Sequence, residues 1–313
     1  MQSEQWLQLC RAAVAGLQPM LADYETIAER ARETGTIGEG GDHTLEIDAA
    51  AEAIVFEQLR GLHAQGLRFR VISEECGAVD FAGTAGLDSA RATPTSGDAT
   101  PIEPAVQADL EPESDHRQLD EERPLLVVVD PIDGSLNAKR GLAHHALSIA
   151  VADGPSMADV YFGFVHVLGT GDEFWAERGS GAWLNGTRLD RSLGERRGRG
   201  DRLELLGLEA ADPRKLNAVI DQVAELGSRL RAYGSIASSL CEVAAGRLDA
   251  MLTLRACRAV DAAAAQLIVR EGGGMVSFPR YEEPLSAPLD LLPHSPVIAA
   301  RNAASLELLA RIV

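Results

Sequence analysis

Hydrophobic and polar positions follow different spacings in different parts of this chain. Residues 3–32 carry apolar side chains at helical spacing, which predicts one long amphipathic helix with Ile27 among its inward-facing residues. A second helix is predicted after Asp48. Residues 125–183 instead show short apolar runs broken by Gly and Asp, which predicts an antiparallel sheet with strands at 125–129, 147–151, 160–165 and 173–176.

After residue 191 the pattern alternates between short apolar runs and helical periods. The alternation predicts strands at 203–208, 229–232 and 249–254 and helices at 214–226, 235–245 and 261–271. This is a second set of α/β layers. We therefore expect an N-terminal α+β domain over residues 1–190 and a C-terminal α/β domain over residues 191–313.

Residues 84–122 differ in composition from the rest of the chain. They are rich in Pro, Ser, Thr, Ala, Asp and Glu and show no usable period, which predicts a mobile or disordered insertion. The insertion separates an acidic segment at Glu74 from another at Asp130, so a lid beside a site is one interpretation. We favour the other, a solvated insertion without a catalytic part.

A turn at residues 130–135 carries the most informative residues of the sequence. It reads Asp-Pro-Ile-Asp-Gly-Ser and directly follows the apolar run 125–129. Carboxylates held on such a turn are candidate metal ligands, and the amides of Gly134 and Ser135 at a helix start would form an anion site. The alternative is an ordinary connection in which the Asp side chains cap backbone amides.

Acids also stand at other predicted element ends. Glu74 and Glu75 end a short strand, and Asp48 and Asp261 stand at predicted helix starts. Taken singly, Asp48 and Asp261 could be N-caps, because acids are favoured at helix N-termini in any protein. Glu74 and Glu75 could belong to a solvated turn. The order and local sequence of these segments resemble one protein family throughout, and this resemblance favours a shared site.

Six sequence blocks resemble the inositol monophosphatase superfamily: GDHTLEID (41–48), VISEECG (71–77), VVVDPIDGS (127–135), AERGSGAWLNG (176–186), GSIASSLCEVAAGRLDA (234–250) and RAVDAAAAQLIVREGGG (258–274). The resemblance covers nearly the whole chain apart from the insertion. It is nearest to the archaeal-type branch that acts on both inositol monophosphate and fructose 1,6-bisphosphate. It implies a layered αβαβα sandwich, intermediate between α+β and α/β, and a homodimer.

The resemblance also implies a metal site. Its side-chain ligands match Glu74, Asp130, Asp133 and Asp261, and the carbonyl of Ile132 completes the set. Unit charges about 4 Å apart repel by roughly 4 kcal/mol at an effective dielectric near 20, so such acids need cations between them. Oxygen-only ligation favours Mg²⁺ over Zn²⁺, and the resemblance implies two or three ions.

In the mechanism that the resemblance implies, a metal-activated water attacks phosphorus in line. Glu74, Ser135 and Asp48 match the family's catalytic residues, with the Ser135 hydroxyl paired to Asp48 to help deprotonate the water. Glu75 either supports the ligands indirectly or is solvated.

Substrate choice is where the sequence departs from the family pattern. Leu254 stands where inositol-specific members place a Glu that binds sugar hydroxyls. Arg255 and Arg258 could instead hold a second phosphate, or they could pair with surface acids. Gly234 and Ser235 resemble a loop that lines the sugar pocket.

We therefore predict a Mg²⁺-dependent phosphomonoesterase acting on a small polyol or sugar phosphate. Inositol 1-phosphate is the first candidate and fructose 1,6-bisphosphate the second. An adenosine 3′,5′-bisphosphate phosphatase is an alternative within the enzyme class. A metal-binding regulatory pseudoenzyme is an alternative from another class, and Leu254 is the only hint of it.

The amino-acid composition narrows the possible partners and the expected cellular compartment. A formal net charge of -18 over 313 residues argues against nucleic acid or an anionic membrane as a partner. Lys occurs only at Lys139 and Lys215, which fits either a GC-rich genome or a high-salt cytoplasm. The four Cys show no metal-binding spacing and no disulfide framework, which predicts a reduced, cytoplasmic protein. No apolar run reaches the length of a membrane span, and the N-terminus does not resemble an export signal.

Overall fold

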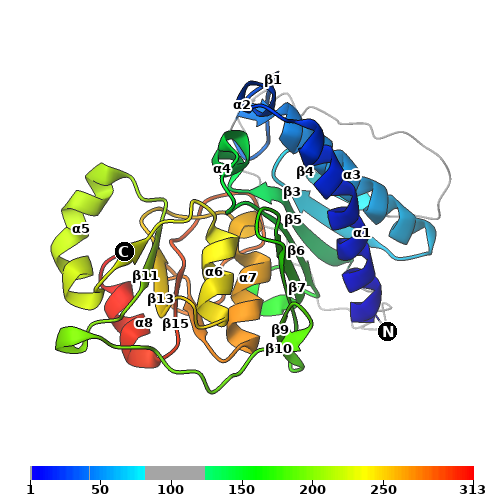
Figure 1. The fold of residues 1–313 in the computed structure, drawn as a ribbon. Helices are drawn as coiled ribbons and strands as arrows, with labels where there is room; N and C mark the ends of the chain where they lie inside the picture. The colour runs from blue at the N-terminus through cyan, green and yellow to red at the C-terminus, as the bar shows by residue number, and fades with distance from the viewer. Residues whose placement is uncertain (1, 42, 82–123) are drawn as a thin grey trace, which may run out of the picture.

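Helices and sheets alternate in layers in the computed structural model, which describes residues 2–41, 43–81 and 124–313 (Figure 1). The insertion predicted at 84–122 lies outside the described residues. The first layer holds helices α1 (Gln2–Asp23) and α3 (Glu46–Ala64), and an eight-stranded sheet follows it. Next come helices α6 (Ile236–Ala244) and α7 (Ala259–Glu271), a five-stranded sheet, and helices α5 (Pro213–Leu226) and α8 (Ala303–Ala310). This order confirms the expected αβαβα sandwich.

The eight-stranded sheet has the strand order β10-β9-β8-β7-β6-β5-β3-β4. Neighbours pair antiparallel except β3 and β5, which run parallel. The antiparallel sheet expected over 125–183 is thus confirmed. The strand bounds are Phe69–Ser73 (β3), Gly77–Phe81 (β4), Leu125–Asp133 (β5), Ala146–Ala152 (β6), Val160–Val167 (β7), Asp172–Glu177 (β8), Gly181–Leu184 (β9) and Thr187–Arg188 (β10).

Helices α1 (Gln2–Asp23) and α3 (Glu46–Ala64) cover one face of this sheet and bury a shared cluster with it. The prediction of one helix over 3–32 was wrong at its C-terminal end. The chain leaves α1 at Asp23, and Thr26 then caps a separate helix α2 (Ile27–Arg30) through a capping box with Glu29. Ile27, expected to face inward, is 56% exposed.

The C-terminal half confirms the predicted alternation. Its sheet has the order β12-β11-β13-β15-β14, and β11 runs parallel to both β12 and β13. The strands are Leu206–Glu209 (β11), Leu230–Arg231 (β12), Ala250–Thr253 (β13), Met275–Ser277 (β14) and Ile298–Ala300 (β15). The helices are Pro213–Leu226 (α5), Ile236–Ala244 (α6), Ala259–Glu271 (α7) and Ala303–Ala310 (α8).

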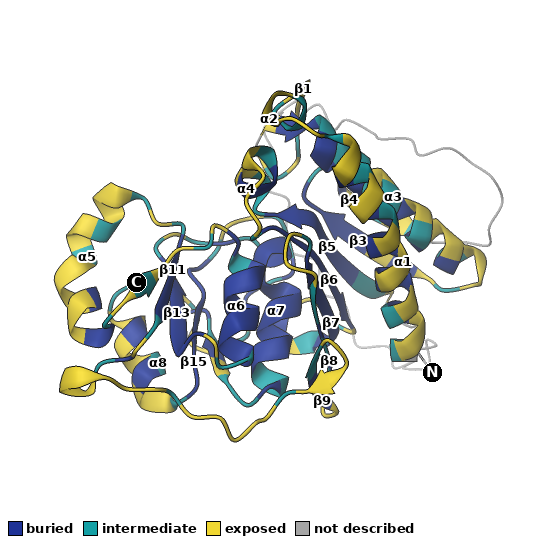
Figure 2. Ribbon diagram, viewed as in Figure 1, coloured by how far each residue is buried: buried dark blue, intermediate teal, exposed yellow. Residues whose placement is uncertain are grey.

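Helices α6 and α7 form the central layer and are buried along most of their length (Figure 2). Small side chains in α7 let the large sheet approach closely: a Cβ added at Gly163 of β7 would lie 2.6 Å from the Ala264 carbonyl oxygen. One apolar cluster joins α6 and α7 to strands of the large sheet. The two halves therefore share a core, and the division at residue 190 stays a prediction.

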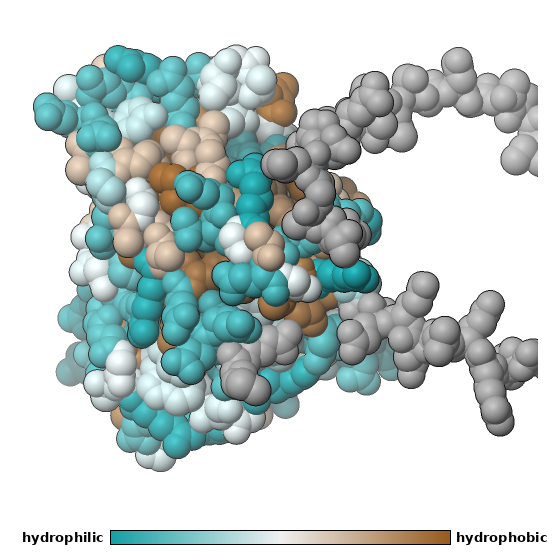
Figure 3. Space-filling view, turned by 90° about the vertical axis from the view of Figure 1, so that its right-hand side faces the viewer, coloured by the Kyte–Doolittle hydropathy of each residue, from teal (hydrophilic) through white to brown (hydrophobic). Residues whose placement is uncertain are grey.

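From the side of α1 and α3, the surface mixes hydrophilic and hydrophobic side chains (Figure 3). Among the described residues, none of the helices has both the length and the apolar character needed to cross a bilayer. The homodimer implied by the resemblance stays a prediction.

Candidate metal centre

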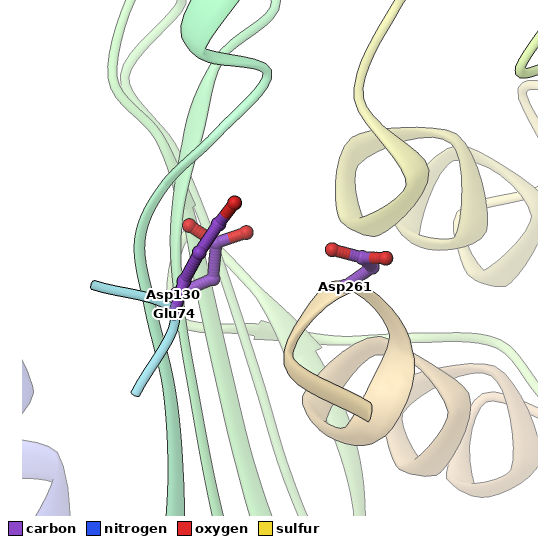
Figure 4. Close-up of side chains that lie close together, drawn as sticks. All are labelled: Glu74, Asp130 and Asp261. Atoms are coloured by element: carbon purple, nitrogen blue, oxygen red, sulfur yellow. The ribbon is translucent and has the colours of Figure 1, made fainter. Parts of the chain in front are cut away.

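Three carboxylates from three separate elements converge at one point (Figure 4). Glu74, Asp130 and Asp261 each offer an oxygen atom, and these atoms lie within 4.8 Å of one another. Because β3 and β5 are parallel with Ser73 opposite Val129, the next residues, Glu74 and Asp130, reach the same edge of the sheet. Asp261 faces them from the first turn of α7. The structure thus brings together three of the four acids predicted as ligands.

Asp133 lies at the end of β5, and its carboxylate is not part of this group of three described acids. Its Oδ2 accepts hydrogen bonds from the Ser235 hydroxyl (2.6 Å) and the Ala237 amide (2.7 Å) at the start of α6. Burial raises the pKa of Asp133, and the negative charge of Asp261 raises it further, which shows that the two carboxylates interact electrostatically. Asp133 therefore links the acid cluster to α6.

Burial makes these acids reluctant to ionise. Exposed fractions are 9% for Glu74, 2% for Asp130 and 7% for Asp133. Burial is the main cause that raises the pKa of Glu74 to about 8, that of Asp133 to about 7 and that of Asp130 well above its ordinary value, and neighbouring carboxylates add to each shift. Such a cluster of oxygen ligands fits divalent cations, which would compensate the crowded charge.

Arg258 contacts the acid cluster directly. Its Nη1 lies 2.7 Å from Glu74 Oε1, and its Nη2 lies 3.3 Å from Asp261 Oδ1. This guanidinium partly offsets the rise in the pKa of Glu74. Of the two predicted arginines, Arg258 thus pairs with acids of the cluster and Arg255 is exposed. Leu254 directly follows β13 (Ala250–Thr253) in the chain and is half-buried.

Asp48 and Ser135 lie near each other, as the resemblance implied. Burial first and the charge of Glu75 second raise the pKa of Asp48 to about 7, while the nearby Ser135 side chain lowers it. The Ser135 hydroxyl donates its hydrogen bond to the Ile132 carbonyl oxygen at 3.1 Å. Within the described residues, Asp48 Oδ1 is buried and has no hydrogen-bond partner. A buried carboxylate oxygen of this kind is costly unless a further group satisfies it.

Neither Asp48 nor Asp261 is an N-cap residue, which was the alternative reading of each. Leu45 and Arg258 hold the N-cap positions of α3 and α7, so each Asp is the third residue of its helix. Asp261 Oδ2 accepts the backbone N–H of Arg258 at 2.8 Å. The Asp261 carboxylate is thereby oriented by the start of its own helix.

Glu75 is held by a loop that also contacts Glu74. Its Oε2 accepts the Thr44 hydroxyl at 2.5 Å. The loop joins β1 (Glu33–Ile37) to β2 (His43–Leu45), and the amides of Glu39 and Gly40 donate to the carbonyl oxygens of Glu75 and Glu74. Of its two predicted roles, simple solvation does not describe Glu75, because its carboxylate is held by Thr44.

Gly134 and the Gly234–Ser235 segment, predicted as phosphate- and substrate-binding, lie side by side. Gly134 precedes the short helix α4 (Ser135–Arg140) and has a positive φ of 91°. A Cβ there would lie 3.0 Å from the Gly234 carbonyl oxygen and 3.1 Å from that of His144. Only glycine combines this conformation with this close approach.

Two residues near the site were missed from the sequence. Glu209 ends β11 as a buried acid bonded to the loop before α6, and Asn137 in α4 bonds the same loop from the other side. A signal for Glu209 existed: like Glu74 and Asp130, it directly follows an apolar strand. Asn137 carries no comparable signal in the sequence.

The fold and this acid cluster agree with what comparison with known proteins shows. The inositol monophosphatase family matches residues 2–313, so the chain belongs to that family. A fructose-1,6-bisphosphatase/inositol-1-monophosphatase of Methanothermobacter thermautotrophicus is 35% identical over 185 residues, which span 57% of this chain and 64% of that protein. The matches with it and the next two relatives of that name span 56% to 64% of those proteins.

A relative with a different name, Nus factor SuhB of Escherichia coli, is 29% identical over 85% of this chain and 82% of its own length. Among solved structures, an inositol monophosphatase-fructose 1,6-bisphosphatase superposes with a TM-score of 0.72. It is 20% identical and covers 98% of this chain and 99% of its own, so it establishes the shared fold.

Proposed function

We propose that this protein is a Mg²⁺-dependent phosphomonoesterase of small polyol or sugar phosphates, with inositol 1-phosphate as first substrate and fructose 1,6-bisphosphate as second. The observation that carries the proposal is the convergence of Glu74, Asp130 and Asp261 within 4.8 Å. Their donors are all carboxylate oxygens, which suit a hard divalent ion that also binds phosphate. The names of the archaeal relatives support the substrate class.

Five groups would hold the ions: the carboxylates of Glu74, Asp130, Asp133 and Asp261 and the carbonyl of Ile132. Bound Mg²⁺ would supply Lewis-acid stabilisation of the phosphoryl oxygens and make a water molecule easier to deprotonate. The Asp133 carboxylate uses Oδ2 for its bonds to α6, so these bonds leave its other oxygen, Oδ1, for an ion.

Ser135 and Asp48 would move the proton of the attacking water. The Ser135 side chain lies close enough to the Asp48 carboxylate to influence its pKa, and a carboxylate at this position can act as a proton acceptor. We propose that Ser135 accepts a proton from the water while its own proton passes to Asp48. The unpartnered Asp48 Oδ1 is the atom that can take it.

Phosphate release tests the proposal directly. The protein should release phosphate from inositol 1-phosphate and fructose 1,6-bisphosphate in Mg²⁺, and a chelator should abolish the reaction. Adenosine 3′,5′-bisphosphate serves as the comparison substrate, and preference for it would move the assignment to the nucleotide alternative. If the protein released no phosphate from any of the three substrates but still bound Mg²⁺, the result would support a regulatory pseudoenzyme instead.

A further inference from the structure

A buried carboxylate outside the acid cluster holds the loop before α6. Glu209 at the end of β11 is 2% exposed. Its Oε1 accepts the Tyr233 amide (2.7 Å) and the Ser239 hydroxyl (2.5 Å), and its Oε2 accepts the Gly234 amide (2.8 Å). All three donors lie on residues 233–239, so one side chain fixes both the loop and the first turns of α6.

The same loop is held from the opposite side by α4. Asn137 Nδ2 donates to the carbonyl oxygens of Tyr233 (2.6 Å) and His144 (2.5 Å). The ring of Tyr233 also stacks on that of His144, with centroids 4.3 Å apart. The loop is thus clamped between Glu209 of the small sheet and Asn137 beside the large one.

The clamped loop ends at the residues that orient Asp133. Ser235 is the N-cap of α6, and its hydroxyl lies 2.6 Å from Asp133 Oδ2. The Ala237 amide meets the same oxygen at 2.7 Å. A shift of this loop would therefore turn the Asp133 carboxylate relative to the other acids.

We propose that Glu209 is a positioning residue for the metal centre, acting through the loop at residues 233–235 on the direction of the Asp133 carboxylate. The inference rests on the proposed function, since it takes Asp133 as a ligand. A carboxylate suits this place because it only accepts hydrogen bonds, and three donors point at it. An amide at the same place would turn an NH₂ group toward a backbone N–H.

The test is Mg²⁺ affinity measured by titration calorimetry on the full chain. Glu209→Gln should weaken Mg²⁺ binding roughly 10- to 100-fold, the usual effect of removing a group that orients a ligand. Asp249→Asn is the matched control. Asp249 is also 2% exposed and accepts two backbone amides, from Arg196 and Leu205, but it lies at the opposite end of the parallel strands β11 and β13. The Asp249→Asn substitution should lower thermal stability without changing Mg²⁺ affinity.

A double-mutant cycle separates positioning from general loosening. Ser235→Ala removes the hydroxyl that bonds Asp133, so Glu209→Gln should weaken Mg²⁺ binding much less in that background than in the wild type. Asp249→Asn should have the same negligible effect in both backgrounds. Fully additive losses for Glu209→Gln and Ser235→Ala would overturn the proposed route through the loop.

A milder variant covers the case in which Glu209→Gln does not fold. Ser239→Ala removes one of the three donors and leaves the carboxylate in place, so it should give a smaller loss of Mg²⁺ affinity in a folded protein. Unchanged affinity in the folded variants overturns the positioning role while leaving the proposed function intact. A wild type that binds no Mg²⁺ overturns both.

Discussion

At Glu74, Asp130 and Asp261, burial disfavours the ionised carboxylate that a metal ligand requires. Each carboxylate is nearly inaccessible to water, and each has another negative group close by. In the protein without ions, protons or Arg258 must offset this charge. The same crowding that makes ionisation costly makes a divalent ion a favourable partner.

Asp133→Asn tests the ligand role at one residue. The variant keeps an oxygen that can accept from Ser235 and Ala237 but removes the charge, so the fold should persist while activity falls roughly 100-fold or more, beyond the loss typical of indirect partners. Phosphate release and circular dichroism measure the two effects. Asp80→Asn is the control, because Asp80 is an exposed acid of β4 that pairs with Arg70 of β3. Full activity in Asp133→Asn would contradict the ligand assignment.

Replacing Arg255 and replacing Arg258 should have different effects on the hydrolysis of the two substrates. Arg255 is exposed, so Arg255→Ala should spare inositol 1-phosphate and lower kcat/KM for fructose 1,6-bisphosphate about tenfold if it binds the second phosphate. Arg258→Ala should lower kcat/KM for both substrates, because Arg258 contacts Glu74 and Asp261. Steady-state kinetics on both esters measure this. A loss confined to the bisphosphate in Arg258→Ala would instead assign the second phosphate to Arg258.

The residues of the site lie at the ends of strands and in the first turns of helices. The parallel pair β3 and β5 delivers Glu74 and Asp130, the first turn of α7 delivers Asp261, and only Gly134 separates Asp133 from the short helix α4. Backbone amides hold two of these carboxylates: Asp130 Oδ1 accepts the Ile132 amide at 3.0 Å, and Asp261 Oδ2 accepts the Arg258 amide at 2.8 Å. The direction of each carboxylate is therefore set by its own element.

The two glycines that bound α4 offer a matched test of the contact between the halves. Gly134 and Gly141 both have positive φ, 91° and 70°, but only a Cβ at Gly134 would meet neighbours, at 3.0 Å and 3.1 Å. Both Gly→Ala changes should cost about 1 kcal/mol or more in conformational strain. Gly134→Ala should also weaken Mg²⁺ binding, since it pushes Gly234 away.

Urea unfolding and Mg²⁺ titration of the two variants measure these effects. Equal stability losses with equal Mg²⁺ affinity would show that the approach of Gly134 to Gly234 is unimportant for the site. A larger loss in Gly134→Ala, in both measurements, is the expected result.

For the whole molecule, the buried acids make stability depend on pH and metal together. The folded-state pKa of Glu74 is raised from 4.5 to about 8, and the pKa values of Asp48 and Asp133 are raised from 3.8 to about 7. A raised pKa means that the folded state binds the proton more tightly than the unfolded state. The stabilisation is therefore complete below the unfolded values and is lost as pH rises through the folded ones.

We therefore expect the Tm of the chelated protein to fall between about pH 5 and pH 8, and Mg²⁺ to raise Tm most at the alkaline end, where the ligands are ionised. Calorimetry in EDTA and in Mg²⁺ across this range measures both trends. Glu74→Gln should flatten the decline in EDTA. A Mg²⁺ effect that is largest at the acidic end would contradict the assignment of these acids as ligands.

Much of this protein could be predicted from the sequence because its signals are local. Apolar runs predicted strands in both sheets, although β14 and β15 of the smaller sheet were missed. Acids at the ends of such runs marked Glu74 and Asp130, and the turn that follows marked Asp133. The break after Asp23 was missed, although Thr26 and Glu29 form a capping box, because the apolar period continues through Ile27. Hydrophobic spacing alone does not reveal where a chain turns.

The sequence by itself determined many of the strands and helices, the family resemblance that implied the layered sandwich, and the acids available for a metal, since periodicity and motif residues are properties of the chain. Only the tertiary structure decided that Arg258 pairs with Glu74 and that Glu209 and Asn137 clamp the loop leading to Asp133. These contacts join residues far apart in the chain. Their partners depend on how parallel strand ends and helix starts meet in space, and no local pattern encodes that meeting.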